Sequence, residues 1–218
     1  MIYLCFVLVA VVSYLLGSLN FGVILSKKLE NDDVRSHGSG NAGTTNMLRN
    51  YGKKLAILTI LGDMLKVGVA IALSFLIFDS IIKNAGELPV IDGVDRNMLL
   101  KSFAGFFCVL GHIFPCFFNF KGGKGVATSG GMVFIIDWRI ALILLAIFII
   151  IVLITKYVSL GSLVMAILYP VFIFVFHKSI LLTLIALVFT IIVVAAHREN
   201  IKKLIHGNES KISLKKSS

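Results

Sequence analysis

The sequence predicts an all-α integral membrane protein with seven transmembrane helices. Of its 218 residues, 58% are hydrophobic and only 15% are charged, and the mean hydropathy of +0.97 lies far outside the range of soluble proteins. Apolar runs long enough to cross a hydrocarbon core of about 30 Å recur along most of the chain. We therefore expect one membrane domain covering residues 1–218 in the cell membrane, with residues 206–218 as a basic, flexible cytoplasmic tail.

Seven apolar runs are candidates for the spans. They cover residues 3–25, 55–78, 99–117, 124–136, 140–155, 158–176 and 180–196. The fourth run is short, because at 1.5 Å per residue it reaches only about 20 Å. Five full crossings, with the fourth and fifth runs as a re-entrant pair, are the alternative. Removing a re-entrant pair subtracts two crossings, so all the remaining connections keep the same side of the membrane under either count.

Lys and Arg set the expected orientation, because they accumulate on the cytoplasmic side of membrane proteins. With an external N-terminus, one face carries 15 of the 21 basic residues and the other face carries four. The basic face is therefore expected to be cytoplasmic, together with the C-terminus. Its basic residues are Lys27, Lys28, Arg35, Arg49, Lys53, Lys54, Lys121, Lys124, Lys156, Arg198, Lys202, Lys203, Lys211, Lys215 and Lys216. They occur in short clusters between apolar runs, so nucleic acid is not an expected partner.

The first cytoplasmic loop, residues 37–52, reads HGSGNAGTTNMLRNYG. Its glycines allow tight turns, and its small polar side chains supply hydrogen-bond donors without bulk. Arg49 carries a planar fork that can hold a phosphate through two bonds. The pattern indicates an anion site, and the alternative is a polar loop whose arginine only sets topology. The candidate ligand-binding residues here are Ser39, Asn41, Thr45, Asn46 and Arg49.

A second cytoplasmic segment, residues 111–131, places Lys121, Gly122, Gly123 and Lys124 at the start of a helix. Backbone amides at a helix N-terminus carry partial positive charge, so a lysine there strengthens a phosphate site. The segment is not a Walker A loop, because Phe118 stands where that motif requires glycine. The alternative is glycine for close helix packing, together with lysines that only set topology.

Polar residues also cluster where the last spans meet the cytoplasmic face. Ser159 lies in the short connection before the sixth span. His197 and Asn200 follow the last span and share a helical face through their spacing of three, while Glu199 points elsewhere. A histidine at a membrane surface can exchange a proton near neutral pH.

Two further polar groups fall near or within apolar runs. Asp63 and Lys66 are three residues apart in the second span, and we expect them to neutralise each other. His112 lies near the end of the third span, where we expect a structural role. His112, Glu199 and Lys121 are kept as secondary candidates for the site.

The strings GSLNFG, DVRSHGSGNAGTTNMLR, GHIFPCFFNFKGGKGVAT, VSLGS and HRENIKKL resemble, in order and spacing, the bacterial membrane glycerol-3-phosphate acyltransferases that use acyl phosphate. The resemblance covers nearly the whole chain. It implies seven spans, an external N-terminus, a cytoplasmic active site and neither cofactor nor metal. Two positions depart from the family pattern, because Asn20 stands where proline is usual and Thr44 where alanine is common.

The resemblance also implies the reaction and its residues. An acyl group passes from acyl phosphate to the 1-hydroxyl of glycerol 3-phosphate, which gives lysophosphatidic acid and phosphate in the first acylation step of phospholipid synthesis. The positions that match the family's functional residues are Ser39, Arg49, Lys124, Ser159, His197 and Asn200. We expect His197, Ser39 and Asn200 to act in catalysis, although a substrate phosphate is an alternative base.

The rival function from another class is a membrane transporter for a small phosphorylated anion. Transporters usually place their site near the bilayer midplane between repeated halves. Here the polar residues gather at one surface and no repeat is visible. The expected partners are therefore the two substrates and the surrounding lipids. The sequence leaves the oligomeric state open, with a monomer as one option.

Overall fold

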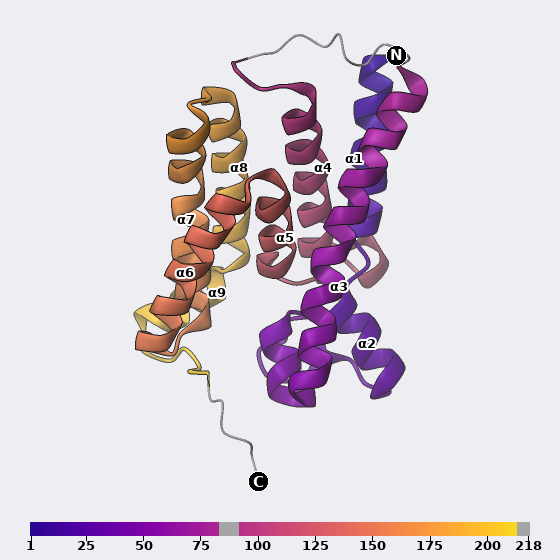
Figure 1. The fold of residues 1–218 in the computed structure, drawn as a ribbon. Coiled ribbons are helices and arrows are strands. Elements are labelled where there is room, and N and C mark those ends of the chain that lie inside the picture. Colours follow the sequence, from indigo (N-terminus) through magenta and orange to yellow (C-terminus); the bar gives the residue numbers. More distant parts are fainter. Residues whose placement is uncertain (83–91, 213–218) are drawn as a thin grey trace. The chain divides into compact units, whose positions relative to one another are not determined.

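The computed structural model describes residues 1–82 and 92–212. The secondary-structure elements within these ranges are α-helices and short 3-10 helices (Figure 1). The all-α class is confirmed. By its contacts the chain divides into two compact units, unit 1 (Met1–Asp137) and unit 2 (Trp138–Ser218). Unit 1 contains α1 (Ile2–Gly17), α2 (Phe21–Leu29), η1 (Val34–Ser36), α3 (Thr44–Ile81), α4 (Arg96–Ile113), η3 (Cys116–Phe118) and α5 (Val126–Ile136). Unit 2 contains α6 (Trp138–Thr155), α7 (Val158–His177), α8 (Ile180–Ala196) and α9 (Arg198–Ile205).

Five helical segments of the described chain are long and apolar enough to cross a membrane. A sixth is added if α8 and α9, which meet at a bend of 62°, form one span. Each of the seven apolar runs is helical, but α5 has only 11 residues. Five or six crossings are therefore supported by length and composition, and a seventh stays a prediction. The five segments are Ile2–Leu29, Thr44–Ile81, Arg96–Phe118, Trp138–Thr155 and Val158–His177.

Two helix boundaries differ from the sequence prediction. The first run, expected as a continuous helix over 3–25, breaks between α1 and α2, where the side-chain oxygen of Asn20 accepts a hydrogen bond from the amide of Val23 at 3.4 Å. Asparagine is a favoured N-cap, so this residue begins a new helix. The loop expected over 37–52 is shorter, because α3 already begins at Thr44 and is interrupted at Gly52, whose φ is 83°. Arg49 therefore lies on a helix.

Glycines bring α1 and α4 into backbone contact. A Cβ atom at Gly17 would lie 2.0 Å from the carbonyl oxygen of Cys108, and one at Gly111 would lie 2.1 Å from that of Tyr14. Only residues without a side chain permit so close a crossing. The hydroxyl of Tyr14 also donates to the carbonyl of Phe114 at 2.7 Å. These contacts hold the end of α1, which leads into α2, against the end of α4, which leads towards the glycine-containing segment before α5.

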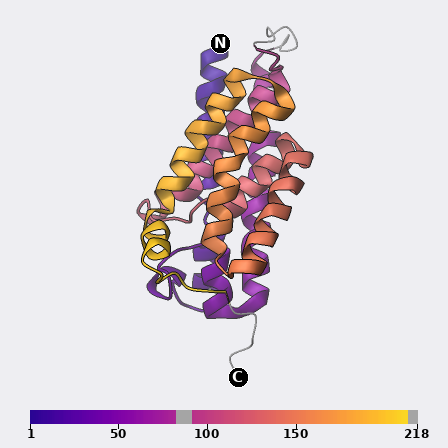
Figure 2. The same cartoon turned by 90° about the vertical axis from the view of Figure 1, so that its left-hand side faces the viewer.

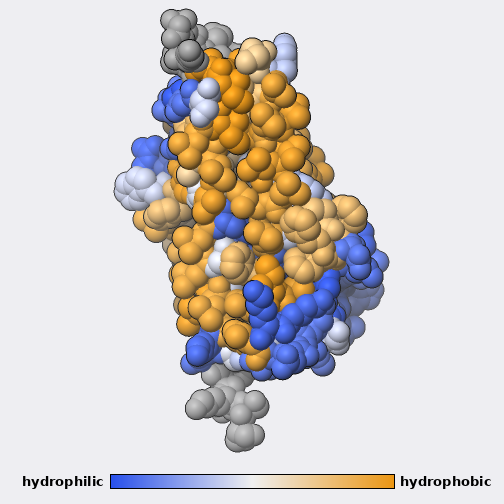
Figure 3. Space-filling view, turned by 90° about the vertical axis from the view of Figure 1, so that its right-hand side faces the viewer, coloured by the Kyte–Doolittle hydropathy of each residue, from blue (hydrophilic) through white to orange (hydrophobic). Residues whose placement is uncertain are grey.

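The polar end of unit 1 has a small apolar core of its own. It consists of Val23, Val34, Ala42, Met47, Leu55 and Ala56, all buried. Figure 3, which looks onto the side of α1, α2 and α3, shows hydrophobic surface over most of the height and hydrophilic surface gathered at the end that carries α2. The first loop is therefore packed onto an apolar base at the polar end of the unit.

In unit 2, α6, α7 and α8 run alongside one another (Figure 2). The hydroxyl of Thr190 on α8 donates to the carbonyl of Ala166 on α7 at 2.7 Å. Beyond α9 the chain returns to the start of α7, because the amide of Ile212 donates to the carbonyl of Lys156 at 2.9 Å. Of the tail expected to be flexible, residues 206–212 are described and 213–218 lie outside the described residues.

Candidate functional site

Asn46 holds the first loop of unit 1 together. Its side-chain amide donates to the carbonyls of Val34, His37 and Asn41 at 2.9, 3.0 and 2.9 Å, and its side-chain oxygen accepts from the amide of Ser39 at 3.1 Å. Asn46 is 2% exposed. Its polar atoms therefore shape the loop, as an asparagine can by acting as donor and acceptor at once, and the predicted contact with substrate stays a prediction.

The remaining loop candidates lie around this amide. Ser39 is exposed between Gly38 and Gly40, whose φ angles of 57° and 68° favour glycine. Asn41 accepts from the amide of Gly43 at 3.0 Å, just before α3 begins. Thr45 is half-buried in the first turn of α3, and Arg49 follows one turn later on an exposed position. The loop therefore presents small polar groups and an arginine at the start of a helix that has no acidic residue in its first turn.

The glycine-rich loop, residues 119–125, leads into α5 in a similar way. Gly125 precedes α5 with φ of 82°, and the first turn of α5 has no acidic residue. Gly122 and Gly123 fold back onto the end of α4, where the amide of Gly123 donates to the carbonyl of His112 at 3.1 Å. Lys121 is exposed and Lys124 half-buried. The arrangement suits an anion at the N-terminus of α5.

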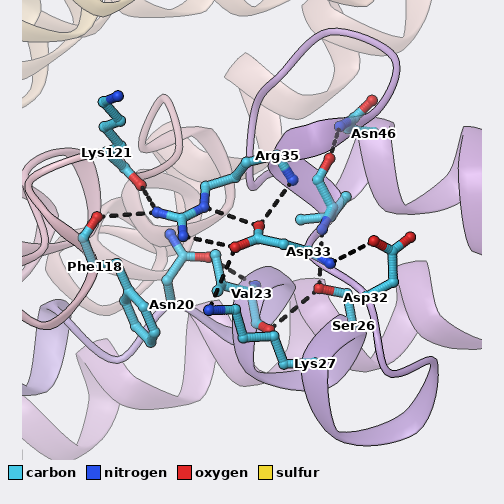
Figure 4. Close-up of polar contacts among 11 residues, drawn as sticks. Asn20, Val23, Ser26, Lys27, Asp32, Asp33, Arg35, Asn46, Phe118 and Lys121 are labelled. Atoms are coloured by element: carbon cyan, nitrogen blue, oxygen red, sulfur yellow. Dashed lines mark hydrogen bonds and ion pairs between the residues drawn. The ribbon is translucent and has the colours of Figure 1, made fainter.

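Arg35 joins the two loops, as Figure 4 shows. Its guanidinium binds Asp33 through Nε at 2.9 Å and Nη2 at 2.7 Å, and its Nη1 donates to the carbonyls of Phe118 and Lys121, both at 3.0 Å. A guanidinium offers five donors in a fixed plane, so one side chain can bind a carboxylate and two carbonyls together. The structure thereby holds the first loop and the glycine-rich loop at the same end of unit 1.

Sequence reasoning missed this pair and gave Arg35 only a topological role. The available signal was the spacing of two between Asp33 and Arg35 in the segment before the glycines. That spacing suits a local carboxylate and guanidinium pair, but the carbonyl partners 83 and 86 residues away cannot be read from it. Lys27, which lies 3.4 Å from Asp33, completes the cluster.

Replacing Arg35 with Ala is expected to raise the KM for the anionic substrate about tenfold, because the glycine-rich loop loses its link to the first loop. Steady-state kinetics in detergent will measure this. Arg96→Ala is the matched control, since Arg96 also binds an aspartate, Asp79, at 2.7 Å but at the opposite end of α4. Equal KM values for the two variants would contradict the prediction.

The hydrogen bond from Arg35 lowers the pKa of Asp33 from 3.8 to about 2, against the opposing effect of its partial burial. A depressed carboxyl pKa stabilises the fold above the unfolded value, and this contribution disappears as pH falls through the folded value. The difference in melting temperature between the wild type and Asp33→Asn is therefore expected to stay constant from pH 8 to about pH 4. It is expected to shrink as the pH falls further, towards about pH 2. A difference that changes near pH 6 would show that another group is responsible.

His197 lies at the bend between α8 and α9 in unit 2, where it is 2% exposed. Its Nδ1 lies 2.8 Å from the carbonyl oxygen of Val193. A carbonyl only accepts, so Nδ1 is the donor and the neutral ring carries its lone pair on Nε2. That is the arrangement of a histidine that takes up a proton at Nε2.

Asn200 and Ser159 lie at the same end of unit 2 as His197. Asn200 donates to the Glu209 carboxylate oxygens at 3.2 and 3.0 Å, so the tail covers this part of α9. Ser159 is 7% exposed at the start of α7, and its hydroxyl has no hydrogen-bond partner within the described ranges. Glu199 points to solvent, 3.5 Å from Lys202. The buried hydroxyl of Ser159 is therefore suited to binding a group that the chain itself does not supply.

These features define an integral membrane protein with anion-suited helix N-termini in unit 1 and a group of polar side chains at one end of unit 2. Within residues 1–82 and 92–212 no group of three or more His, Cys, Asp or Glu side chains gathers as a metal site would require, and the absence of a metal stays a prediction.

The family model for glycerol-3-phosphate acyltransferase matches residues 7–207. The chain belongs to this family, which confirms the resemblance. It is 43% identical to the glycerol-3-phosphate acyltransferase of Clostridioides difficile over 213 residues, which cover 97% of each chain. With the enzyme of that name from Bacillus subtilis it shares 40% identity over 205 residues, covering 94% of this chain and 96% of the other.

Two solved structures are similar to the whole fold. One is the integral membrane glycerol 3-phosphate acyltransferase PlsY (YgiH) in its glycerol 3-phosphate form, with 35% identity, a TM-score of 0.79, and 95% of this chain and 96% of that chain covered. The lysophosphatidic acid form of that protein has a TM-score of 0.77 and 35% identity, with 95% of each chain covered.

Proposed function

We propose that the chain transfers an acyl group from acyl phosphate to the 1-hydroxyl of glycerol 3-phosphate, in the first acylation step of phospholipid synthesis. Family membership supports acyl transfer to glycerol 3-phosphate. The observation that carries the proposal is the pair of glycine-containing loops joined by Arg35, each leading into a helix N-terminus without acidic residues. Such a pair suits two phosphorylated reactants.

Acyl phosphate fits this chain because little covalent help is required from the protein. The donor is a mixed anhydride whose carbonyl is already activated and whose leaving group is stable phosphate. The glycerol 3-phosphate oxygen forms a bond to the carbonyl carbon, the bond from that carbon to the phosphate oxygen breaks, and the hydroxyl proton passes to a base. The protein must hold two anions together and stabilise the oxyanion that forms.

Arg49 and Lys124 carry positive charge next to the two loops, and we assign them to the substrate phosphates. Gly122 and the amides that lead into α3 and α5 are suited to phosphate or oxyanion binding. Gly123 is assigned to the same site through the shape of its loop, because its own amide donates to the His112 carbonyl at 3.1 Å. Ser39, Asn41 and Thr45 supply donors from the first loop. We assign no direct substrate contact to Asn46, because its amide is used within the loop.

We assign the proton transfer to His197, because the Val193 carbonyl fixes Nδ1 as the donor and leaves Nε2 as the basic nitrogen. A substrate phosphate is the alternative base. Ser159 and Asn200 are assigned to orienting the acyl phosphate or its acceptor. In this proposal the N-terminus is external, α5 completes a set of seven spans, and the reaction occurs at the cytoplasmic face.

The test is to incubate the purified protein with glycerol 3-phosphate and acyl phosphate, with acyl-CoA as a parallel donor. Phosphate release and lysophosphatidic acid formed from acyl phosphate alone would support the proposal. Product formed only from acyl-CoA would overturn the choice of donor. Flux of labelled glycerol 3-phosphate into vesicles without acylated product would favour the transporter.

A further inference from the structure

A buried cluster of ionisable groups lies inside unit 1, and the proposed chemistry does not use it. Asp63, Lys66 and His112 are 1%, 4% and 2% exposed, and all three lie in helices that cross the apolar region. Charged side chains in that environment are costly and usually have a specific role. Mutual neutralisation of Asp63 and Lys66, which are 2.9 Å apart, explains only part of the arrangement.

Lys66, on α3, contacts the end of α1, the break that follows α1, and α4. Its Nζ donates to the carbonyls of Gly17 and Leu19 at 2.9 and 3.0 Å, where the break between α1 and α2 leaves carbonyls without helical partners. It also lies 3.0 Å from Nδ1 of His112 on α4. An ammonium group has hydrogens but no lone pair, so Lys66 meets Nδ1 as a donor, and the same Nδ1 lies 3.4 Å from the Asp63 carboxylate. Lys66 thereby sets the orientation of the His112 ring.

The opposite edge of the His112 ring touches the glycine-rich loop. A Cβ atom at Gly123 would lie 2.0 Å from Nε2 of His112, so the ring occupies the space that a side chain at position 123 would need. A Cβ atom at Gly122 would lie 2.1 Å from the His112 carbonyl oxygen. The loop residues just before Lys124 are therefore shaped directly against His112.

We propose that Asp63, Lys66 and His112 form a positioning cluster that fixes the conformation of the glycine-rich loop, and with it the place of Lys124. The chain of contacts runs from the carbonyls at the break between α1 and α2 through Lys66 to His112, and then to the glycine-rich loop. Stability alone does not explain a buried ion pair, because replacing such a pair with apolar residues of similar volume often leaves a protein as stable as before. The effect on substrate binding rests on the proposed function, whereas the effect on the loop does not.

The first experiment measures loop conformation without any activity. Trypsin cleaves after Lys121 and Lys124 in the loop, and after Lys53 and Lys54 on α3 as an internal reference. The His112→Leu variant, purified in detergent, is expected to be cut at the loop about 10-fold faster than the wild type, with unchanged cleavage at the reference sites. His112→Gln, which retains an acceptor for Lys66, is expected to restore part of the protection. Unchanged loop cleavage, or an equal increase at both places, would overturn the proposal.

The second experiment separates substrate binding from turnover. His112→Leu is expected to raise the KM for glycerol 3-phosphate about 10- to 100-fold and to change kcat much less. A KM equal to that of the wild type would overturn the proposal. If the wild-type protein does not acylate glycerol 3-phosphate at all, the proposed function fails, and the cleavage experiment still decides the role of the cluster.

A double-mutant cycle tests the contact itself. Gly123→Ala introduces a methyl group into the space of the His112 ring, and is expected to increase loop cleavage. In the His112→Ala background that space is open, so the added effect of Gly123→Ala is expected to shrink markedly. Gly130→Ala is the matched control, since a Cβ atom there meets nothing within 4 Å. Fully additive effects would show that ring and loop are not coupled.

Discussion

Replacing His197 with Ala is expected to lower kcat about 100- to 10,000-fold and to leave the KM for both substrates within a few-fold. Removal of a general base has effects of this size, and the bond from Nδ1 to the Val193 carbonyl at 2.8 Å leaves Nε2 to accept the proton. Initial rates at saturating substrate will measure the loss. A change confined to KM would instead assign His197 to substrate positioning, and a substrate phosphate would then be the base.

His206→Ala is a matched control for this measurement. Nδ1 of His206 lies 2.7 Å from the carbonyl oxygen of Lys202, four residues earlier, as Nδ1 of His197 lies near that of Val193. Unlike His197, His206 is exposed. Its removal is expected to leave kcat unchanged. An equal loss in the two variants would mean that general damage to α9 lowers the rate, and His197 would not be the base.

Arg49→Ala and Lys124→Ala are each expected to raise the KM for an anionic substrate about 10- to 100-fold. Hydrogen bonds to charged groups contribute about 1.5–3 kcal/mol, and a lost contact of that size gives such a factor. Measuring the KM for glycerol 3-phosphate and for acyl phosphate separately will assign each cation to one phosphate. Arg49→Lys is expected to recover only part of the loss, because an ammonium cannot form the planar two-bond contact.

Lys53→Ala controls for the loss of a positive charge at this end of α3, since Lys53 is exposed four residues beyond Arg49. Its effect on either KM is expected to be small, as is usual for solvent-screened charges. A KM increase in Lys53→Ala equal to that in Arg49→Ala would reduce the role of Arg49 to general attraction of anions.

Composition and periodicity were sufficient to predict the apolar helices, because membrane spans carry long apolar runs whatever their packing. The positions where these helices begin and break depend on individual side-chain contacts, which the apolar pattern does not reveal. The first span breaks at Asn20 because its side chain caps α2, and α3 begins before Gly52 because the loop before it closes around Asn46.

Arg49, Lys124 and His197 could be named as site candidates from the sequence because their residue types themselves indicate chemistry, and their roles stay predictions. The roles of Arg35 and His112 depend on partners far away in the sequence. Arg35 meets carbonyls of the glycine-rich loop, and His112 meets a lysine 46 residues earlier. No spacing rule predicts such contacts, because they arise from the way α1, α3 and α4 pack together.

The internal bonding of the first loop has a thermodynamic consequence. Asn46 and Arg35 already fix this loop in the free protein, so its conformational entropy is lost during folding and not when the anion arrives. Because a preorganised loop does not have to be ordered when the anion binds, less of the interaction free energy offsets lost entropy and the affinity is higher. This matters more for a small substrate than for a large one, because a small substrate makes few contacts that could offset the cost of ordering a loop.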